Sequence, residues 1–244
     1  MRRVTPSLSI LALLLPLCAQ GADLVILVDT ATEMPMAHFE RQRLVDGIHR
    51  DIGLALARHM KRTPKFMSLP RKRIVRSLEE GAADVLCSYV PEWLDASFGW
   101  TQPFIPIVEV LIAERSVERP RQVSDVAGQA VGTVLGYAHP EMEELLGDGF
   151  VRADAPTTEA NLRKLAMGRV KYALVGKSFL DWHRAKVDST LQLHPPLVVK
   201  SYMGQCAVSP KARVKLAEVD RAVARMVRDG TIRAIETKYG APES

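Results

Sequence analysis

The chain has 244 residues, of which 47% are apolar and 25% are charged. These values are typical of a globular protein and exclude a disordered tail protein, a collagen-like chain and a polytopic membrane protein. Lys plus Arg number 33 against 28 Asp plus Glu, a surplus too thin and too scattered to predict a nucleic-acid groove. We interpret the densest basic cluster, Arg71-Lys72-Arg73 with Arg76, as a solvated helix face.

Residues 1–21 resemble a secretory signal peptide. Arg2 and Arg3 precede the apolar stretch Leu8–Leu17, and Ala19-Gln20-Gly21 supplies the small residues that a signal peptidase reads. The apolar stretch is about 10 residues long, whereas a span of the bilayer needs about 20. We therefore expect an exported, soluble mature chain that begins near Ala22 and lies in the periplasm.

The three cysteines leave two questions open. Cys18 would complete a lipobox, but Leu17 occupies a position that requires a small residue, so we expect no lipid. Export permits a disulfide between Cys87 and Cys206, although two cysteines 119 positions apart do not demand one. The six His are dispersed and no CxxC or HExxH motif occurs, so the sequence predicts neither a metal nor a cofactor.

Strand and helix patterns alternate along the mature chain. Apolar runs predict strands, and apolar residues at helical spacing predict helices. The expected strands lie at 24–28, 66–68, 84–90, 105–113, 130–134, 172–175 and 198–208. The expected helices lie at 47–60, 71–80, 140–147, 159–167, from about 178, from Ser209-Pro210 to Gly230, and after Gly230. This alternation predicts an α/β protein with mostly parallel sheets and helices on both faces.

Several motifs, in order, resemble the periplasmic solute-binding proteins of amino-acid ABC transporters (family 3). They are the strand that ends in Asp29-Thr30, Leu78-Glu-Glu-Gly-Ala-Ala-Asp84, Trp100-Thr-Gln-Pro-Phe104, Val123–Gly132, Gly168–Val175 and Asp229–Tyr239. The resemblance implies a two-lobed, hinged binding protein (type II). Lobe 1 would comprise 22–107 and 201–244, and lobe 2, inserted at 108–200, would be joined to it by crossing strands near 105–112 and 199–206.

The resemblance also implies a ligand chemistry from which this sequence departs. Family members use an Arg shortly after the third strand to bind the ligand carboxylate, and an Asp after the strand of Gly168–Val175 to bind its ammonium. Here no Arg lies between Arg76 and Arg115, and Gly176-Lys177 follows Val175. We therefore expect a small polar or anionic solute rather than an α-amino acid bound in the usual way.

The candidate ligand-binding residues come from four segments. Glu33 follows the first strand, Ser88 and Tyr89 end the third, and Trp93 lies in the aromatic loop after it; Trp100 either lines the cleft or packs on the core. Backbone N–H groups of the loop before Pro140 predict an anion-binding turn, and Lys177 is a candidate cation. The residues of that loop are Gly136, Tyr137, Ala138 and His139.

Three function classes remain open. We expect a receptor that closes its lobes on a small molecule and delivers it, as a monomer, to an inner-membrane ABC permease. The alternatives are a sensory or adaptor module without its own permease, and a dehydratase-like periplasmic enzyme on the same fold, with Glu33, Glu92 or Lys177 as its proton-transfer group. No triad or paired-carboxylate pattern occurs, so we expect no enzyme activity.

Overall fold

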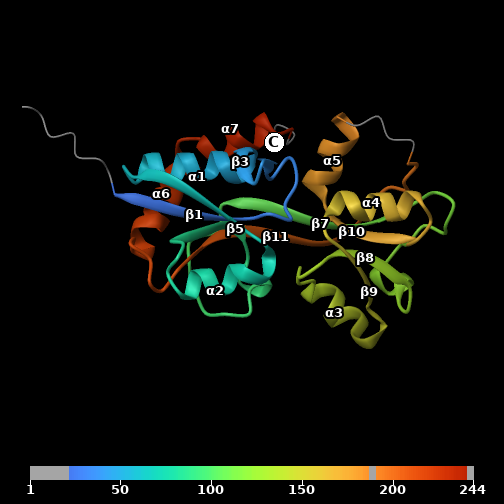
Figure 1. Cartoon of the computed structure of the whole chain (residues 1–244). Coiled ribbons are helices and arrows are strands. Elements are labelled where there is room, and N and C mark those ends of the chain that lie inside the picture. Colours follow the sequence, from blue (N-terminus) through green and yellow to red (C-terminus); the bar gives the residue numbers. More distant parts are fainter. Residues whose placement is uncertain (1–21, 187–190, 241–244) are drawn as a thin grey trace, which may run out of the picture.

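A computed structural model of the chain (Figure 1) describes residues 22–186 and 191–240. Residues 1–21 lie outside the described residues. They hold the predicted signal peptide, including Cys18 of the possible lipobox, and end at the predicted cleavage site before Ala22. Among the described residues, no helix combines the length and the apolar character that crossing a bilayer requires. No group of three or more His, Cys, Asp or Glu within the same ranges could hold a metal ion.

One sheet runs through both halves of the molecule in the order β4-β1-β5-β11-β7-β10-β8-β9. In lobe 1, the strands are β1 (Asp23–Asp29), β4 (Thr63–Leu69), β5 (Val85–Tyr89) and the short β6 (Gly99–Trp100), which pairs with β11. In lobe 2, they are β8 (Ala130–Val134), β9 (Val151–Ala155) and β10 (Tyr172–Gly176). Parallel pairing of β4, β1 and β5 brings their carboxyl ends to one edge, which faces lobe 2 (Figure 1).

Two long antiparallel strands, β7 (Ile105–Ala113) and β11 (Leu197–Val208), pass from one lobe to the other. Their pairing runs from Leu197 opposite Leu111 to Gly204 opposite Ile105. They are the two crossings that the sequence predicts near 105–112 and 199–206. The division of the lobes at 107/108 and 200/201 falls within these strands and stays a prediction.

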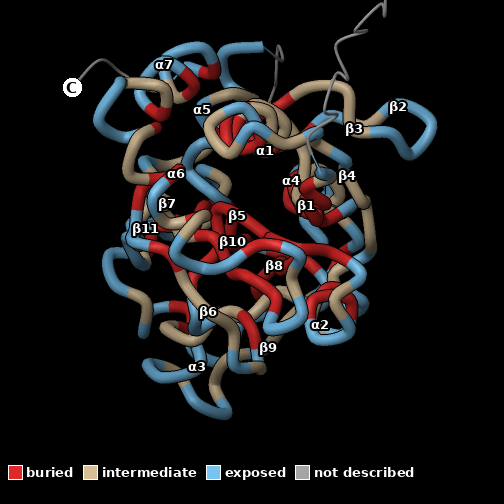
Figure 2. The backbone as a smooth tube through the Cα atoms, turned by 90° about the vertical axis from the view of Figure 1, so that its left-hand side faces the viewer, coloured by how far each residue is buried: buried red, intermediate tan, exposed pale blue. Residues whose placement is uncertain are grey.

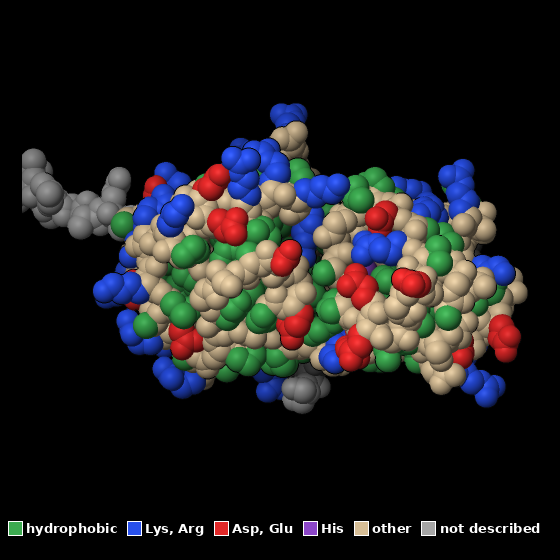
Figure 3. All heavy atoms as spheres, turned by 90° about the horizontal axis from the view of Figure 1, so that it is seen from below, with side chains coloured by type: hydrophobic (Ala, Val, Ile, Leu, Met, Phe, Trp, Pro, Cys, Tyr) green, Lys and Arg blue, Asp and Glu red, His purple; other side chains and the backbone are tan. Residues whose placement is uncertain are grey.

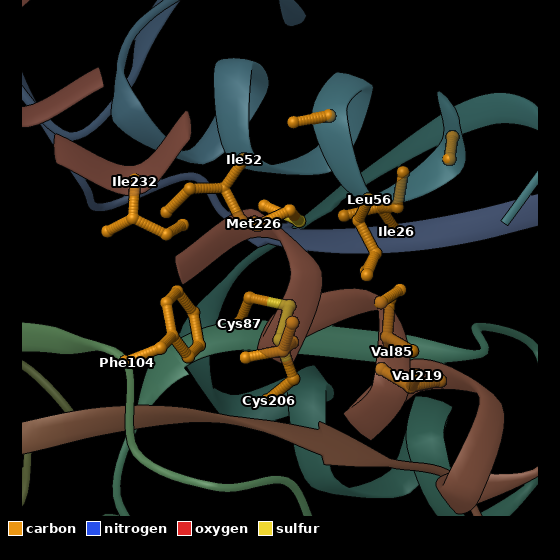
Figure 4. Packing of buried hydrophobic residues seen from close by; sticks show 14 of the residues in the cluster. Ile26, Ile52, Leu56, Val85, Cys87, Phe104, Cys206, Val219, Met226 and Ile232 are labelled. Carbon is orange, nitrogen blue, oxygen red and sulfur yellow. A yellow bond between two sulfur atoms is a disulfide. The ribbon is translucent and has the colours of Figure 1, made fainter. Parts of the chain in front are cut away.

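Helices cover both faces of the sheet in lobe 1. On one face lie α1 (Ile48–His59), α6 (Leu216–Arg228) and α7 (Thr231–Lys238), and on the other lies α2 (Ile74–Glu79) after the 3-10 turn Arg71–Arg73 (Figure 1). Gly53 lets α1 approach β4 closely, because a Cβ there would lie 2.6 Å from Cε1 of Phe66. Apolar side chains of α1, α6, α7 and the sheet interlock around the Cys87–Cys206 disulfide (Figure 4).

Lobe 2 repeats this arrangement on a smaller scale. Helices α4 (Thr158–Ala166) and α5 (Lys177–Lys186) lie on one face of its strands, and α3 (Pro140–Leu146) lies on the other (Figure 1). Each face has its own buried apolar cluster, one around Leu162 and Leu165, the other around Val131 and Met142. Buried residues accordingly concentrate along the central strands, whereas the outer turns of the helices are exposed (Figure 2).

The Cys87–Cys206 disulfide, which the sequence left open, is formed in the structure. The two residues are directly opposite each other on the antiparallel strands β5 and β11, with their Cα atoms 3.9 Å apart. The bond therefore closes a loop that contains the whole of the inserted lobe.

One predicted helix boundary is wrong, and four strands were not predicted. Helix α6 begins at Leu216, not at Ser209-Pro210, because the Ser209 hydroxyl donates to the carbonyl of Leu78 and accepts from the N–H of Lys211. Ser209 therefore stabilises the loop before α6 and does not cap the helix. The unpredicted strands are β9, β6 and the hairpin of β2 (His38–Glu40) and β3 (Arg43–Asp46).

Candidate interlobe ligand site

A cavity of about 450 Å³ lies between the lobes, within the range of small-molecule sites. Its lobe 1 wall comes from the loops after β1, β4 and β5 and from the start of α1. Its lobe 2 wall comes from Tyr137 and Ala138 after β8, Thr158 at the start of α4, and the first turn of α5. The stretch Ile105–Glu109 of the crossing strand β7 also lines it.

Arg71 is the cation of the lobe 1 wall, so our interpretation of this residue as part of a solvated helix face is wrong. It follows Pro70 in the turn after β4, at the same sheet edge as the ends of β1 and β5. Its guanidinium Cζ lies 4.9 Å from the ring centroid of Tyr89 and 5.2 Å from that of Tyr137, and Nη2 donates to the carbonyl of Trp93 at 2.9 Å. Lys72, Arg73 and Arg76 are exposed, as predicted.

The end of β5 supplies two buried polar side chains. Tyr89 is 5% exposed, and burial raises the pKa of its hydroxyl well above the ordinary value. That hydroxyl lies 3.4 Å from Oδ2 of Asp29, whose other oxygen caps the turn after β1 by accepting from the N–H of Ala31. Ser88 is 3% exposed with φ of 62°, and its Oγ has no hydrogen-bond partner among the described residues. An unpartnered buried hydroxyl is the kind of group that a ligand satisfies.

Glu33 links the two lobes directly. Its Oε2 accepts a hydrogen bond of 2.9 Å from the backbone N–H of Glu159, in the first turn of α4. Burial raises the pKa of the Glu33 carboxyl, while the hydrogen bonds at the start of α4 act in the opposite direction. Because these N–H groups already contact Glu33, a ligand anion would compete with a residue of the protein for them.

The first turns of α5 form the remaining wall. Nζ of Lys177 lies 2.5 Å from Oδ2 of Asp181, four residues further along the helix, and both side chains are about half exposed. The charge of Lys177 is therefore paired within lobe 2. The ring of Trp182 lies 6.2 Å from that of Tyr239, the residue directly after α7, which is a second contact between the lobes.

A buried acid and a buried histidine lie beside each other on the lobe 2 side. Nδ1 of His139 lies 2.7 Å from Oε1 of Glu109, with 4% and 13% of the two side chains exposed. Glu109 lines the cavity, and its Oε2 has no hydrogen-bond partner among the described residues. On the lobe 1 wall, burial lowers the pKa of His49 to about 4, so this imidazole is neutral at neutral pH.

The structure brings seven of the nine predicted ligand-binding residues together. Those that line the cavity are Glu33, Ser88, Tyr89, Trp93, Tyr137, Ala138 and Lys177. Gly136 and His139 do not line it: Gly136 lies over the side chain of Arg71, and His139 points to Glu109. Trp100 packs against the lobe 1 core and does not line the cavity.

Sequence reasoning missed Arg71, His49 and Glu109 as lining residues. A signal existed for Arg71, because it follows a parallel strand whose carboxyl end shares an edge with those of β1 and β5. Glu109 is the one charged residue of the strand Ile105–Ala113. A charged side chain in an otherwise apolar strand indicates a polar site, because a buried charge is costly without a partner.

The sequence model of the bacterial extracellular solute-binding proteins, family 3, matches residues 25–242. The chain belongs to this family.

Solved structures of low sequence identity share the fold. An ancestral arginine-binding protein bound to arginine is 18% identical, with a TM-score of 0.75 over 90% of this chain and 99% of that one. The arginine-, lysine-, histidine-binding protein ArtJ from Geobacillus stearothermophilus is 17% identical, with a TM-score of 0.73 over 91% and 96%. An ancestral amino acid-binding protein described as a precursor of cyclohexadienyl dehydratase is 15% identical, with a TM-score of 0.72 over 90% and 96%. No curated protein sequence matches significantly.

Proposed function

We propose that this chain is a periplasmic receptor that captures a small polar molecule bearing an acidic group in the interlobe cavity and delivers it to an ABC importer. Membership of the solute-binding family supports the receptor role. The signal peptide predicted at residues 1–21 supports the periplasm. The observation that carries the ligand class is the position of Arg71.

Arg71 fits the role of the anion-binding residue for three reasons. Its guanidinium lies between aromatic rings of both lobes, so that an anion bound to it would contact both. Among the described residues it forms no ion pair within 4.0 Å, and its Nη2 donates a hydrogen bond to the backbone carbonyl of Trp93. The unpartnered hydroxyl of Ser88 lines the same cavity. A guanidinium can bind a carboxylate in two parallel hydrogen bonds.

This assignment replaces Lys177 as the principal cation, because Lys177 already pairs with Asp181. It also places the anion-binding Arg in the turn after β4, whereas the family resemblance implies an Arg after the third strand, β5. The ligand is therefore bound from a different direction than in the arrangement that the family resemblance implies.

The same contacts favour binding over catalysis. The three candidates for proton transfer are Glu33, Lys177 and Glu92. Glu33 accepts a hydrogen bond from the start of α4, Lys177 pairs with Asp181, and Glu92 is exposed outside the cavity lining. We therefore assign to the cavity the capture of a solute, with the crossing strands β7 and β11 as the hinge for lobe closure.

A thermal-shift screen of small carboxylates, phosphates and neutral sugars against the mature chain tests this function. We expect carboxylates to raise Tm, and Arg71→Met to weaken their binding by about 10- to 100-fold, as the loss of a charged hydrogen bond predicts. Lys72→Met is the matched control, because Lys72 is the exposed neighbour. A ligand that binds Arg71→Met as tightly as the wild type contradicts the assignment.

A further inference from the structure

We propose that Glu33 of lobe 1 caps the N-terminus of α4 in lobe 2 and thereby holds the two lobes together without the help of a solute. We call the contact of Glu33 with Thr158 and Glu159 the interlobe latch. The closed arrangement is then the stable one before a solute binds, and a solute enters only when the latch opens. This inference goes beyond the proposed function and does not depend on the chemistry of the solute.

Lobe 1 presents Glu33 on a turn that its own backbone fixes. The carbonyl of Glu33 accepts hydrogen bonds from the N–H groups of Met36 and Ala37, at 3.0 and 3.2 Å. Just before it, the N–H of Thr32 donates to the carbonyl of Asp29 at the end of β1. The backbone on both sides of Glu33 is therefore held within lobe 1, and the side chain reaches lobe 2 from a fixed base.

Helix α4 needs acceptors for the N–H groups of its first turn, because these groups have no partner within the helix. The Thr157 side chain accepts from the N–H of Ala160 at 3.2 Å. The N–H of Glu159 donates to Oε2 of Glu33 at 2.9 Å, and the Thr157 side chain and the N–H of Thr158 also hydrogen-bond this carboxyl. Lobe 2 thus caps one of these N–H groups itself, and lobe 1 caps two.

The latch depends on an acceptor oxygen more than on a full charge. The positive end of the helix dipole favours a carboxylate at this place. Burial acts against it and raises the pKa of the Glu33 carboxyl, and the charge of Glu159 acts in the same direction. A neutral amide at position 33 would offer an oxygen to the same N–H groups without the cost of burying a charge.

The turn that carries Glu33 meets lobe 2 at a second point. The Tyr137 hydroxyl hydrogen-bonds the side chain of Thr32, and the Tyr137 ring lies 5.2 Å from Cζ of Arg71. The carbonyl of Tyr137 accepts from Nη1 of Arg152 at 2.8 Å, which holds the loop after β8 in place. Adjacent residues of one lobe 1 turn therefore contact two segments of lobe 2, and the protein's own groups make all of these contacts.

The test measures the separation of the lobes with no solute added. The mature chain is unfolded and refolded with its disulfide intact, which removes cellular solutes, and nitroxide labels are attached at Glu40→Cys in lobe 1 and Met167→Cys in lobe 2, both exposed positions. Double electron–electron resonance then gives the distribution of distances between the labels. We expect the closed population to dominate. Glu33→Ala should lower the ratio of closed to open molecules about tenfold or more, as the loss of a charge-assisted hydrogen bond predicts.

Three further variants separate the latch from a general effect of substitution. Glu33→Gln should keep most of the closed population, because its amide oxygen accepts from the same N–H groups. Tyr137→Phe, which removes the hydroxyl that meets Thr32, should shift the population in the same direction as Glu33→Ala. Glu92→Ala removes an exposed acid outside the cavity lining and should leave the distribution unchanged. Circular dichroism verifies that each variant is folded.

Two results would overturn the latch: an unsubstituted Glu33 chain that is mainly open without solute, or a Glu33→Ala chain with the same distance distribution as its parent. Neither result bears on Arg71, whose assignment depends on the screen of carboxylates. If the lobes are latched and no acid binds, the proposed function fails and the latch stands.

Discussion

Removal of the Cys87–Cys206 disulfide should destabilise the protein strongly. The cross-link closes a loop of 119 residues that contains the whole of the inserted lobe. In the chain-entropy description, a loop of this length restricts the unfolded state by about 5 kcal/mol at 25 °C. We expect Cys87→Ala/Cys206→Ala to lower the free energy of unfolding by roughly 3–5 kcal/mol, because relaxation in the native state recovers part of the loss. Alanine is suitable because both cysteines are buried in the apolar cluster of Figure 4.

Urea unfolding of the two proteins, followed by circular dichroism, measures this difference. Wild-type protein kept reduced throughout the urea series is the matched control and should unfold near the midpoint of the double variant, because it too lacks the cross-link. A difference in unfolding free energy below about 1 kcal/mol would refute the reasoning, since the loop-closure contribution would then be absent.

Three further predictions address the buried polar groups and the cavity. Burial lowers the pKa of the His49 imidazole from 6.5 to about 4, so between these pH values the unfolded chain binds a proton that the folded chain does not. The free energy of unfolding should therefore fall by about 3 kcal/mol as the pH falls from 6.5 to 4. His49→Gln should flatten that part of the curve of Tm against pH. Asp84, fully buried, accepts hydrogen bonds from the backbone N–H groups of Val25 and Arg213, so Asp84→Asn should cost roughly 2–3 kcal/mol in urea unfolding, whereas exposed Asp95→Asn should be neutral. Ligand binding should change the tryptophan fluorescence, and Trp93→Phe should remove most of that change, because Trp93 lines the cavity; an undiminished change would place the reporter elsewhere.

The overall fold could be predicted because its signals are local and repeated. Apolar runs predicted the crossing strands β7 and β11 within two residues of their ends, and the alternation of strands and helices predicted the α/β lobes. Short elements with weak patterns were not predicted. The three-residue strand β2 has no buried residue, and the two-residue strand β6 exists only through its pairing with β11.

The site was only partly predictable, because its polar groups depend on which segments meet in space. The segments at strand ends that the sequence indicated do line the cavity, and they include Glu33, Ser88 and Tyr137. Arg71 lay in a basic run whose other members are exposed, and only the turn at Pro70 directs it into the cavity. His139, which directly precedes α3, contacts Glu109, 30 residues away in the sequence on strand β7.

The charges on the molecular face drawn in Figure 3 fit a protein whose partner is a small molecule. Seen from the side of α2 and α3, acidic and basic side chains alternate with apolar ones, and no continuous basic stripe crosses that face (Figure 3). This pattern gives no electrostatic footprint for a nucleic acid there. The strongest concentration of unsatisfied polar atoms that we identify lies at the interlobe cavity, at Ser88, His49 and Glu109.

The central claim is that Arg71 holds an acidic group of a small solute between the two lobes. Native mass spectrometry of the exported chain, purified without refolding, tests it most directly when the bound molecule is released and identified. The account predicts one molecule per chain, bearing a carboxylate or a similar acidic group, and loss of that complex in Arg71→Met but not in Lys72→Met. A one-to-one complex with a molecule that lacks an acidic group, or a complex equally populated in Arg71→Met, would contradict it.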